Sequence, residues 1–347
     1  MSQFMPSRNE ERGQVYSLLN GNVHLSSDFI LDNAYLRDGD AAFVGGSLIE
    51  GIGNSMSDVD VHVVTDELRR ERDIALDRHY RTLSTDRSIL TGAAPTAEVF
   101  LIHTVVPSTH IKVDIEYRSK ADMDALVSQV RSTFDYATRS LVLLTKYMSA
   151  RDMAFVHRLF HSHGLAGKAY LDDLRDRMGL KVFQYLMYRW KASDFSVLLD
   201  IVGAWNEGEW ARCADLAREN MVTQFHAYTH LCGNTNYHRK WIVRYGARAG
   251  VDALLYGRYL HLLLAGCGRD TGETKAYILA TIDFIDELFE ASRLLLQAEP
   301  LFPSGALAKE RVAAFFQHET EEYSDMEMQY RLRVYEPTGN ATRAWFA

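Results

Sequence analysis

The sequence predicts an α+β protein in which a small mixed β-sheet is followed by an all-helical bundle. Up to about residue 120, short runs rich in β-branched residues are separated by Gly, Asp and Ser, a pattern typical of strands and turns. From residue 121 onward, apolar residues recur at intervals of three and four, the period of a helix buried on one side. We therefore divide the 347 residues into a sheet domain at 1–120 and a helical domain at 121–347.

The first domain should contain both strands and helices. The β-rich runs predict four strands, at 41–44, 59–64, 96–106 and 110–117. Apolar residues near helical spacing predict one helix within 11–19 and another around 66–83. The sheet should therefore be small, with helices beside it.

The second domain should be almost wholly helical. The periodicity predicts helices at 132–148, 167–173, 180–190, 195–202, 209–228, 247–264, 274–298 and 306–323. Pro300 and Pro303 stand between the last two, as expected of residues that cannot continue a helix. The mixed composition of 331–347 predicts an arm or a frayed end.

Composition limits the class of protein and its partners. The net charge of −8 argues against a long nucleic acid as the main partner, because such affinity rests on many Lys and Arg contacts. Cys213, Cys232 and Cys267 lack the spacing of a zinc site or a disulfide framework, so we expect reduced thiols and a cytoplasmic location. No segment is apolar enough to predict a signal peptide or a membrane span. The oligomeric state is left open.

The most informative segment runs from Phe43 to Val64. Gly45, Gly46 and Ser47 offer backbone N–H groups and a hydroxyl with little bulk, so a phosphate can come close. After a spacer come Asp58 and Asp60, which alternate with valines and should share one face of a strand. Carboxylates that close repel one another unless a cation or proton intervenes, and hard oxygen ligands favour Mg²⁺ bound together with phosphates. The competing interpretation is a surface turn and an edge strand with solvated acids.

This arrangement resembles the DNA polymerase β-like nucleotidyltransferase superfamily, whose pattern is Gly-Ser, a spacer, and two acids separated by one hydrophobic residue. The resemblance implies that Gly46 and Ser47 are the Gly-Ser pair and that Asp58 and Asp60 are metal ligands. Gly45 and Ser57, at the two ends of this loop, join them as nucleotide-binding candidates. Glu50 stands where many members carry Arg, so the cation for the triphosphate should come from the helical half of the chain.

The same resemblance requires a third carboxylate on a neighbouring strand. Asp114 matches the hydrophobic-Asp-hydrophobic pattern better than Glu116, which lies nearer the end of its strand. The competing interpretation is a half-buried strand with a wet polar face. Three acids can hold two Mg²⁺ ions, with Mn²⁺ as a substitute, in the two-metal arrangement for in-line displacement. Asp114 is also a candidate acceptor for the hydroxyl proton.

Three basic residues are candidates for binding the triphosphate. Lys146 ends a predicted helix, where a lysine commonly just complements the helix dipole. Lys240 and Arg244, with Arg248, recur at four-residue spacing and would form one basic helix face. The alternative for this face is a solvated surface whose charges pair with acids elsewhere.

Histidine and aromatic clusters have simpler explanations. His157 and His161 have the i, i+4 spacing of a metal pair, but a buried or capping histidine is commoner than a ligand. The aromatic run of Phe183, Tyr185 and Tyr188 with Trp190 should lie in the core of the bundle.

The expected function is Mg²⁺-dependent transfer of a nucleoside monophosphate from an NTP to a hydroxyl of a small-molecule acceptor, with release of pyrophosphate. One alternative is a synthase that joins nucleotides into a signalling oligonucleotide, and another is a toxin-like transferase that modifies protein or RNA. The non-enzymatic alternative is an NTP-binding module without turnover.

Overall fold

The computed structural model describes residues 11–84, 96–192, 194–248, 250–268, 270–317, 324–337 and 342–346. The chain forms two compact units. Unit 1 joins Met1–Gln129 to Ala150–Leu180, and unit 2 joins Val130–Ser149 to Lys181–Ala347. The division therefore differs from a single boundary at residue 120, because 150–180 packs with the sheet.

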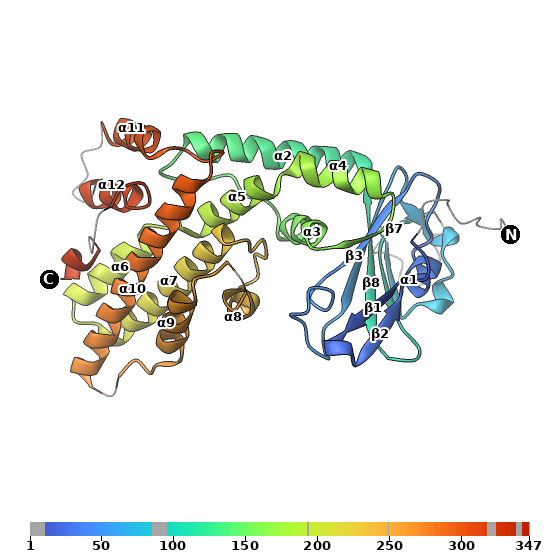
Figure 1. The fold of residues 1–347 in the computed structure, drawn as a ribbon, viewed down its shortest axis with the longest axis horizontal. Coiled ribbons are helices and arrows are strands. Elements are labelled where there is room, and N and C mark those ends of the chain that lie inside the picture. Colours follow the sequence, from blue (N-terminus) through green and yellow to red (C-terminus); the bar gives the residue numbers. More distant parts are fainter. Residues whose placement is uncertain are drawn as a thin grey trace. The chain divides into compact units, whose positions relative to one another are not determined.

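Unit 1 is built on a mixed sheet whose order in the described chain is β5-β7-β8-β4-β3-β9, with β6 also paired to β7 (Figure 1). Only β4 and β8 run parallel, while the other pairs are antiparallel. The strands are β3 (Ala41–Gly45), β4 (Val59–Thr65), β5 (Arg69–Arg70), β6 (Arg81–Ser84), β7 (Glu98–Val105), β8 (Lys112–Ser119) and β9 (His163–Ala166). The four predicted strands and the α+β class are confirmed.

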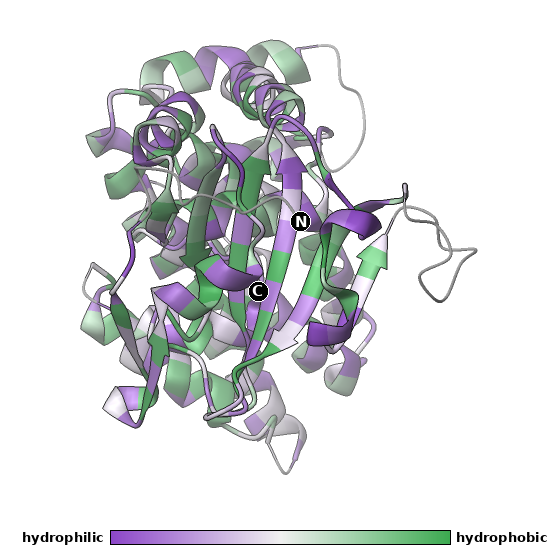
Figure 2. Ribbon diagram, turned by 90° about the vertical axis from the view of Figure 1, so that its right-hand side faces the viewer, coloured by the Kyte–Doolittle hydropathy of each residue, from purple (hydrophilic) through white to green (hydrophobic). Residues whose placement is uncertain are grey.

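The central strand β4 is covered on both faces. Val59, Val61 and Val63 point into the apolar core, as their alternation predicted. On the opposite face, His62 stacks on Phe43 at 4.9 Å and meets the ring of Phe155 edge-on at 5.2 Å. Of the residues of β4, only Asp60, near its start, is not buried. Figure 2 shows both hydrophobic and hydrophilic stretches along the strands of the sheet.

Two helices predicted in unit 1 are wrong. Within 11–19, Val15–Leu18 forms β1, which pairs with β2 (Val23–Ser26) ahead of α1 (Ser27–Asn33). Residues 66–83 form β5, two 3₁₀ turns (Glu71–Asp73 and Leu76–Arg78) and most of β6. The apolar residues there, such as Leu68 and Leu76, pack on the core of the sheet, so their spacing did not reflect a helix.

Unit 1 is completed by helices from the segment 150–180, which follows the sheet in the sequence. They are α3 (Ala150–Phe160) and α4 (Lys168–Met178), and α3 was not among the predicted helices. Phe155, Val156 and Leu159 of α3 are fully buried. Helix α2 (Lys120–Arg139) contributes its first part to unit 1 and its last part to unit 2. The helix predicted at 132–148 corresponds to the end of α2, which ends nine residues earlier than predicted.

Unit 2 is helical, with α7 packed along α10 and α6 (Figure 1). Phe183, Tyr185 and Tyr188 are buried in it, as predicted. The helices are α5 (Leu180–Ala192), α6 (Ser196–Asn206), α7 (Trp210–Leu231), α8 (Ile242–Gly246), α9 (Ala253–Leu264), α10 (Thr271–Ala298), α11 (Gly305–Phe316) and α12 (Ser324–Leu332). Residues 318–323 of the last predicted helix, and 338–341 and 347 of the predicted arm, lie outside the described residues. Part of that arm, 331–337 with 342–346, is described and includes the end of α12 and a 3₁₀ turn at Arg343–Phe346.

Two further expectations concern the whole chain. Cys213, Cys232 and Cys267 are free thiols, as expected. In the described parts of the chain, none of the helices has the length and apolar character needed to cross a membrane.

Candidate active site

Two of the predicted metal ligands lie directly opposite each other on the sheet. Asp60 of β4 and Asp114 of β8 are register partners on parallel strands. Side chains at matched positions of neighbouring strands point to the same face, and the strands themselves lie about 4.8 Å apart. Asp58 precedes β4 and is close enough to raise the pKa of both. The structure therefore brings together the three carboxylates that the sequence singled out.

These carboxylates are electrostatically strained. Burial, with smaller contributions from Asp58 and Asp114, raises the pKa of Asp60 to about 7, although Arg158 opposes the shift. Burial also raises the pKa of Asp114, with Asp58 adding to the effect and His103 opposing it. Burial and mutual repulsion of this kind are relieved by a proton or by a bound cation.

The loop that follows β3 is shaped around Asp60. Gly46 has a φ of +93°, and a Cβ atom there would overlap the Asp60 carboxylate. Gly45 is the register partner of Asp60 on β3, and a Cβ atom on it would lie 3.5 Å from the Cβ of Arg158. Gly46 is therefore required by its close approach to the acid, whereas a Cβ at Gly45 would make only ordinary van der Waals contact with helix α3.

The rest of the loop is a compact turn. The carbonyl of Ser47 accepts N–H groups from Ile52 at 3.0 Å and from Gly53 at 2.7 Å. The hydroxyl of Ser57 accepts the N–H of Asn54 at 3.1 Å, which closes the turn just before Asp58. Ser47 thus fixes the start of the loop, and Ser57 fixes the point at which it enters β4.

Arg158 of α3 is a functional candidate that the sequence reasoning missed. Its Nε atom lies 2.9 Å from Oδ2 of Asp60, and the two side chains are 26% and 16% exposed. No local pattern identifies this residue, because only the packing of α3 on the sheet brings it to the carboxylates.

The neighbouring residue on α3 explains Glu50, the acid within this loop. His157 Nε2 lies 2.9 Å from Oε1 of Glu50, and both side chains are buried. His157 therefore has a carboxylate partner in the loop, and this pair fastens the loop to α3. The ring of His161 lies 4.9 Å from that of His157, so the two histidines are neighbours, as their spacing predicted.

His103 of β7 holds the third acid and was also missed. It is the register partner of Asp114 on the antiparallel strand, and its Nδ1 lies 2.6 Å from Oδ1 of Asp114. A signal was available, because the two predicted strands 96–106 and 110–117 form a hairpin whose short connection sets the register. Extending that register two strands across the sheet places His103, Asp114 and Asp60 in one row.

Glu116, the rejected candidate for third acid, is engaged elsewhere. Its Oε1 lies 3.0 Å from Arg118 Nε and 2.8 Å from Arg151 Nε. Arg118 in turn reaches Asp152 of α3 at 2.6 Å. This network ties the beginning of α3 to β8 and leaves Asp114 as the third carboxylate of the site.

The three carboxylates suit a divalent cation in their chemistry. They supply only hard oxygen donors, and burial together with the neighbouring carboxylates raises the pKa of Asp60 to about 7. In the described residues, no group of three or more His, Cys, Asp or Glu side chains is already arranged so that it could hold a metal ion. Arg158 and His103 each hold an oxygen, of Asp60 and Asp114 respectively. Asp58, Asp60 and Asp114 are therefore the residues that would hold Mg²⁺.

The predicted phosphate-binding cations all lie in unit 2. Lys146 is exposed in an irregular segment, with Nζ 5.2 Å from the ring of Tyr136, so its predicted place at a helix end is wrong. Lys240 belongs to the 3₁₀ turn Arg239–Trp241 and Arg244 to α8, both exposed. The single basic helix face is therefore wrong as well, because these residues lie on two short elements ahead of α9.

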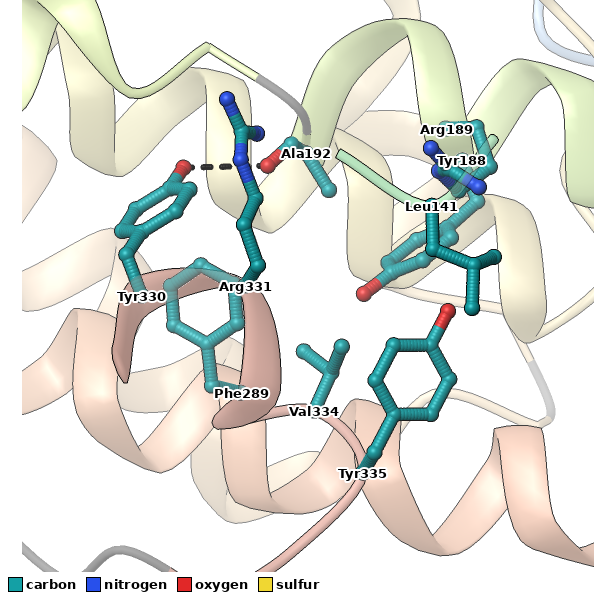
Figure 3. A pocket seen from close by; sticks show the side chains of 9 residues that line it. All are labelled: Leu141, Tyr188, Arg189, Ala192, Phe289, Tyr330, Arg331, Val334 and Tyr335. Atoms are coloured by element: carbon teal, nitrogen blue, oxygen red, sulfur yellow. Dashed lines mark hydrogen bonds between the residues drawn. The ribbon is translucent and has the colours of Figure 1, made fainter. Parts of the chain in front are cut away.

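Two hollows are poor candidates for a substrate site. One lies away from the carboxylates of unit 1, and the other is too small for a substrate. In unit 1, a polar hollow of about 470 Å³ lies beyond the other ends of β4 and β8, beside Asp66 and Ser119. In unit 2, a cavity of about 20 Å³ has room for about one water. Figure 3 shows Tyr188 and Tyr335 among its lining residues, together with the bond from the Tyr330 hydroxyl to the carbonyl of Ala192 at 3.0 Å. Neither hollow is lined by Asp58, Asp60 or Asp114.

Comparison of the sequence with protein-family models gives no match, and comparison with curated proteins gives none either.

Proposed function

We propose that this chain is a Mg²⁺-dependent nucleotidyltransferase that transfers a nucleoside monophosphate from an NTP to a hydroxyl of a small-molecule acceptor and releases pyrophosphate. The observation that carries this proposal is the register of Asp60 with Asp114, beside a loop whose Gly46 is shaped to the Asp60 carboxylate. A phosphate seated against this small-residue loop would lie next to three carboxylates, the combination that metal-assisted phosphoryl transfer requires.

Each residue of the cluster has a separate part in this proposal. Asp58, Asp60 and Asp114 would hold Mg²⁺, or Mn²⁺ in its place, and such ions when bound neutralise phosphate charge and lower the pKa of an acceptor hydroxyl. Asp114 also accepts the hydroxyl proton, with its carboxylate held in place by His103. Gly45, Gly46 and Ser47 let the phosphates approach, because their side chains add almost no bulk.

The acceptor is proposed to be a small molecule because the chain as a whole carries a net charge of −8. Products formed from NTPs alone would instead identify an oligonucleotide synthase, and labelling of protein or RNA would identify a toxin-like transferase. Mass analysis of the products formed with each of the four NTPs separates these outcomes.

The proposal is tested by removing two charges without changing shape. Asp58→Asn with Asp60→Asn keeps the side-chain size but removes the metal-binding charge, so pyrophosphate release should fall to background while circular dichroism is unchanged. Asp66→Asn is the matched control, since Asp66 follows the same strand at its other end and is exposed. Undiminished pyrophosphate release in the double variant would show that these acids do not carry the reaction.

A further inference from the structure

Arg158 stands where a metal ion and a nucleotide phosphate would both need to be. Its guanidinium lies 2.9 Å from Asp60, and its Cβ packs against the position of Gly45. At 26% exposure the side chain is not locked in the core. It is thus a partly exposed cation at the junction of the carboxylates and the phosphate loop.

The ion pair is not needed to hold α3 in place. Phe155 and Leu159 anchor the helix in the core, and the buried pair of His157 with Glu50 fastens it to the loop. At its beginning, Asp152 and Arg151 join it to the network on β8. Arg158 therefore has a role besides fixing the helix.

The loop itself lacks a cation. Residues 45–53 contain no Lys or Arg, and Glu50, the acid within this segment, is paired with His157. An NTP brings several negative charges to this loop, and a guanidinium fits phosphate oxygens with two parallel hydrogen bonds. In unit 1, Arg158 is the cation that the structure places next to both groups.

We propose that Arg158 is the resident counter-ion of Asp60 and that it exchanges partners during binding: a divalent cation takes the Asp60 carboxylate, and the released guanidinium binds the phosphates of the nucleotide. The inference rests on the proposed function for its second step only. The first step follows from charge, because a guanidinium and a dication on one carboxylate repel each other. No covalent bond changes in either step.

The first step predicts that Arg158 competes with metal. Arg158→Met keeps the aliphatic stem but removes the charge, so the Kd for Mn²⁺, measured by calorimetry on the full chain at pH 8 without nucleotide, should fall about tenfold. Arg151→Met is the matched control, because Arg151 lies on the same helix but pairs with Glu116, and its Kd should equal that of the wild type. Arg158→Lys retains the charge and should also stay close to the wild type.

The second step predicts opposite effects on metal and nucleotide. Although Arg158→Met binds Mn²⁺ more tightly, its KM for NTP should rise about tenfold, because the phosphates lose their guanidinium. A residue that only supported the fold would weaken both, so this split separates a functional from a structural role. An unchanged or weaker Mn²⁺ affinity in a folded Arg158→Met variant overturns the inference, and so does a wild-type chain that fails to bind Mn²⁺.

Failure of the Arg158 inference can be distinguished from failure of the proposed function. Absence of NTP turnover with intact competition between Arg158 and Mn²⁺ would refute the reaction but keep the first step. A second measurement uses the wild type alone, in case Arg158→Met does not fold. Phenylglyoxal labelling of Arg158, located by mass spectrometry, should increase several-fold when Mn²⁺ is added, and unchanged labelling would contradict the exchange.

Discussion

Asp60 can occupy its place only because residue 46 is a glycine, which has a hydrogen atom where other residues have a side chain. Gly46 adopts a φ of +93°, and any Cβ would overlap the carboxylate. Gly51, in the same loop, has a φ of +71° but has open space where a Cβ would go. Substitutions at these two glycines can therefore separate the cost of backbone strain from the cost of contact with Asp60.

Gly46→Ala should cost roughly 1–3 kcal/mol of stability in urea unfolding and abolish pyrophosphate release, because the new methyl group displaces Asp60. Gly51→Ala should cost only about 1 kcal/mol and leave turnover intact, since the strain there is confined to the backbone. Full turnover in Gly46→Ala would mean that Asp60 does not need its present position.

His62 shows how context changes the meaning of an alternating residue. His62 lies two residues after Asp60 in β4 and therefore on the same face, but it is buried against Phe43 and Phe155, and burial lowers its pKa to about 3. The polar face is therefore restricted to the first residues of β4. Only the acids at that end reach the site.

Among the elements, α3 determines the character of the site. One turn of it supplies His157 to Glu50 and Arg158 to Asp60. His157 and His161 have helical spacing in the sequence, but no helix was predicted at 150–160, and His161 lies just past the end of α3. Its contribution follows from where it packs, because a helix laid across a sheet can present adjacent side chains to a loop and to a strand.

In unit 2, the loop after α7 is held by buried histidines. His226 Nε2 donates to the carbonyl of Asn236 at 3.0 Å, and His230 Nδ1 donates to that of Asn234 at 2.7 Å. Burial is the main cause that lowers the pKa of His226 to about 4, with Lys191 and Arg239 adding to it. The folded loop thus requires a neutral imidazole at this position.

This element gives a pH-dependent prediction. An unfolded histidine titrates near 6.5, so below that pH the unfolded chain binds a proton that the folded chain refuses until about pH 4. Stability should therefore fall by roughly 1.4 kcal/mol per pH unit between these values. Between pH 7.5 and pH 5, the wild type should lose about 2 kcal/mol more than His226→Gln in urea unfolding. Equal losses would show that His226 is charged in the folded state.

On the scale of the whole molecule, the residues proposed to bind metal and nucleotide are divided between two units. The carboxylates and Arg158 belong to unit 1, whereas Lys240 and Arg244 belong to unit 2 and are exposed. A role for the second pair in nucleotide binding stays a prediction from sequence.

Lys240→Ala with Arg244→Ala tests that role. If the pair receives phosphates, the KM for NTP should rise about tenfold with little change in kcat, because two charge-assisted contacts are lost before the chemical step. Arg212→Ala is the control, since Arg212 is an exposed arginine of unit 2 that pairs with Glu209. A KM equal to that of the wild type would assign the pair to the solvated surface.

Much of the architecture could be predicted because local patterns reflect burial directly. The alternation of 59–64 and the helical periods of 180–190 and 209–228 match β4, α5 and α7. The pattern failed at 66–83, where apolar residues pack on the sheet from turns and short strands, and at 150–160, where α3 was not predicted. Short segments of this kind take their structure from their neighbours.

The sequence by itself determined the fold class, because strand alternation and helical periods are local properties, and with the family resemblance it singled out three acids, Asp58, Asp60 and Asp114. Only the tertiary structure decided what surrounds those acids. His103 reaches Asp114 through strand pairing, and Arg158 reaches Asp60 through the packing of a helix 98 residues further along the chain. Contacts between residues so far apart depend on how the elements pack, which no local pattern encodes.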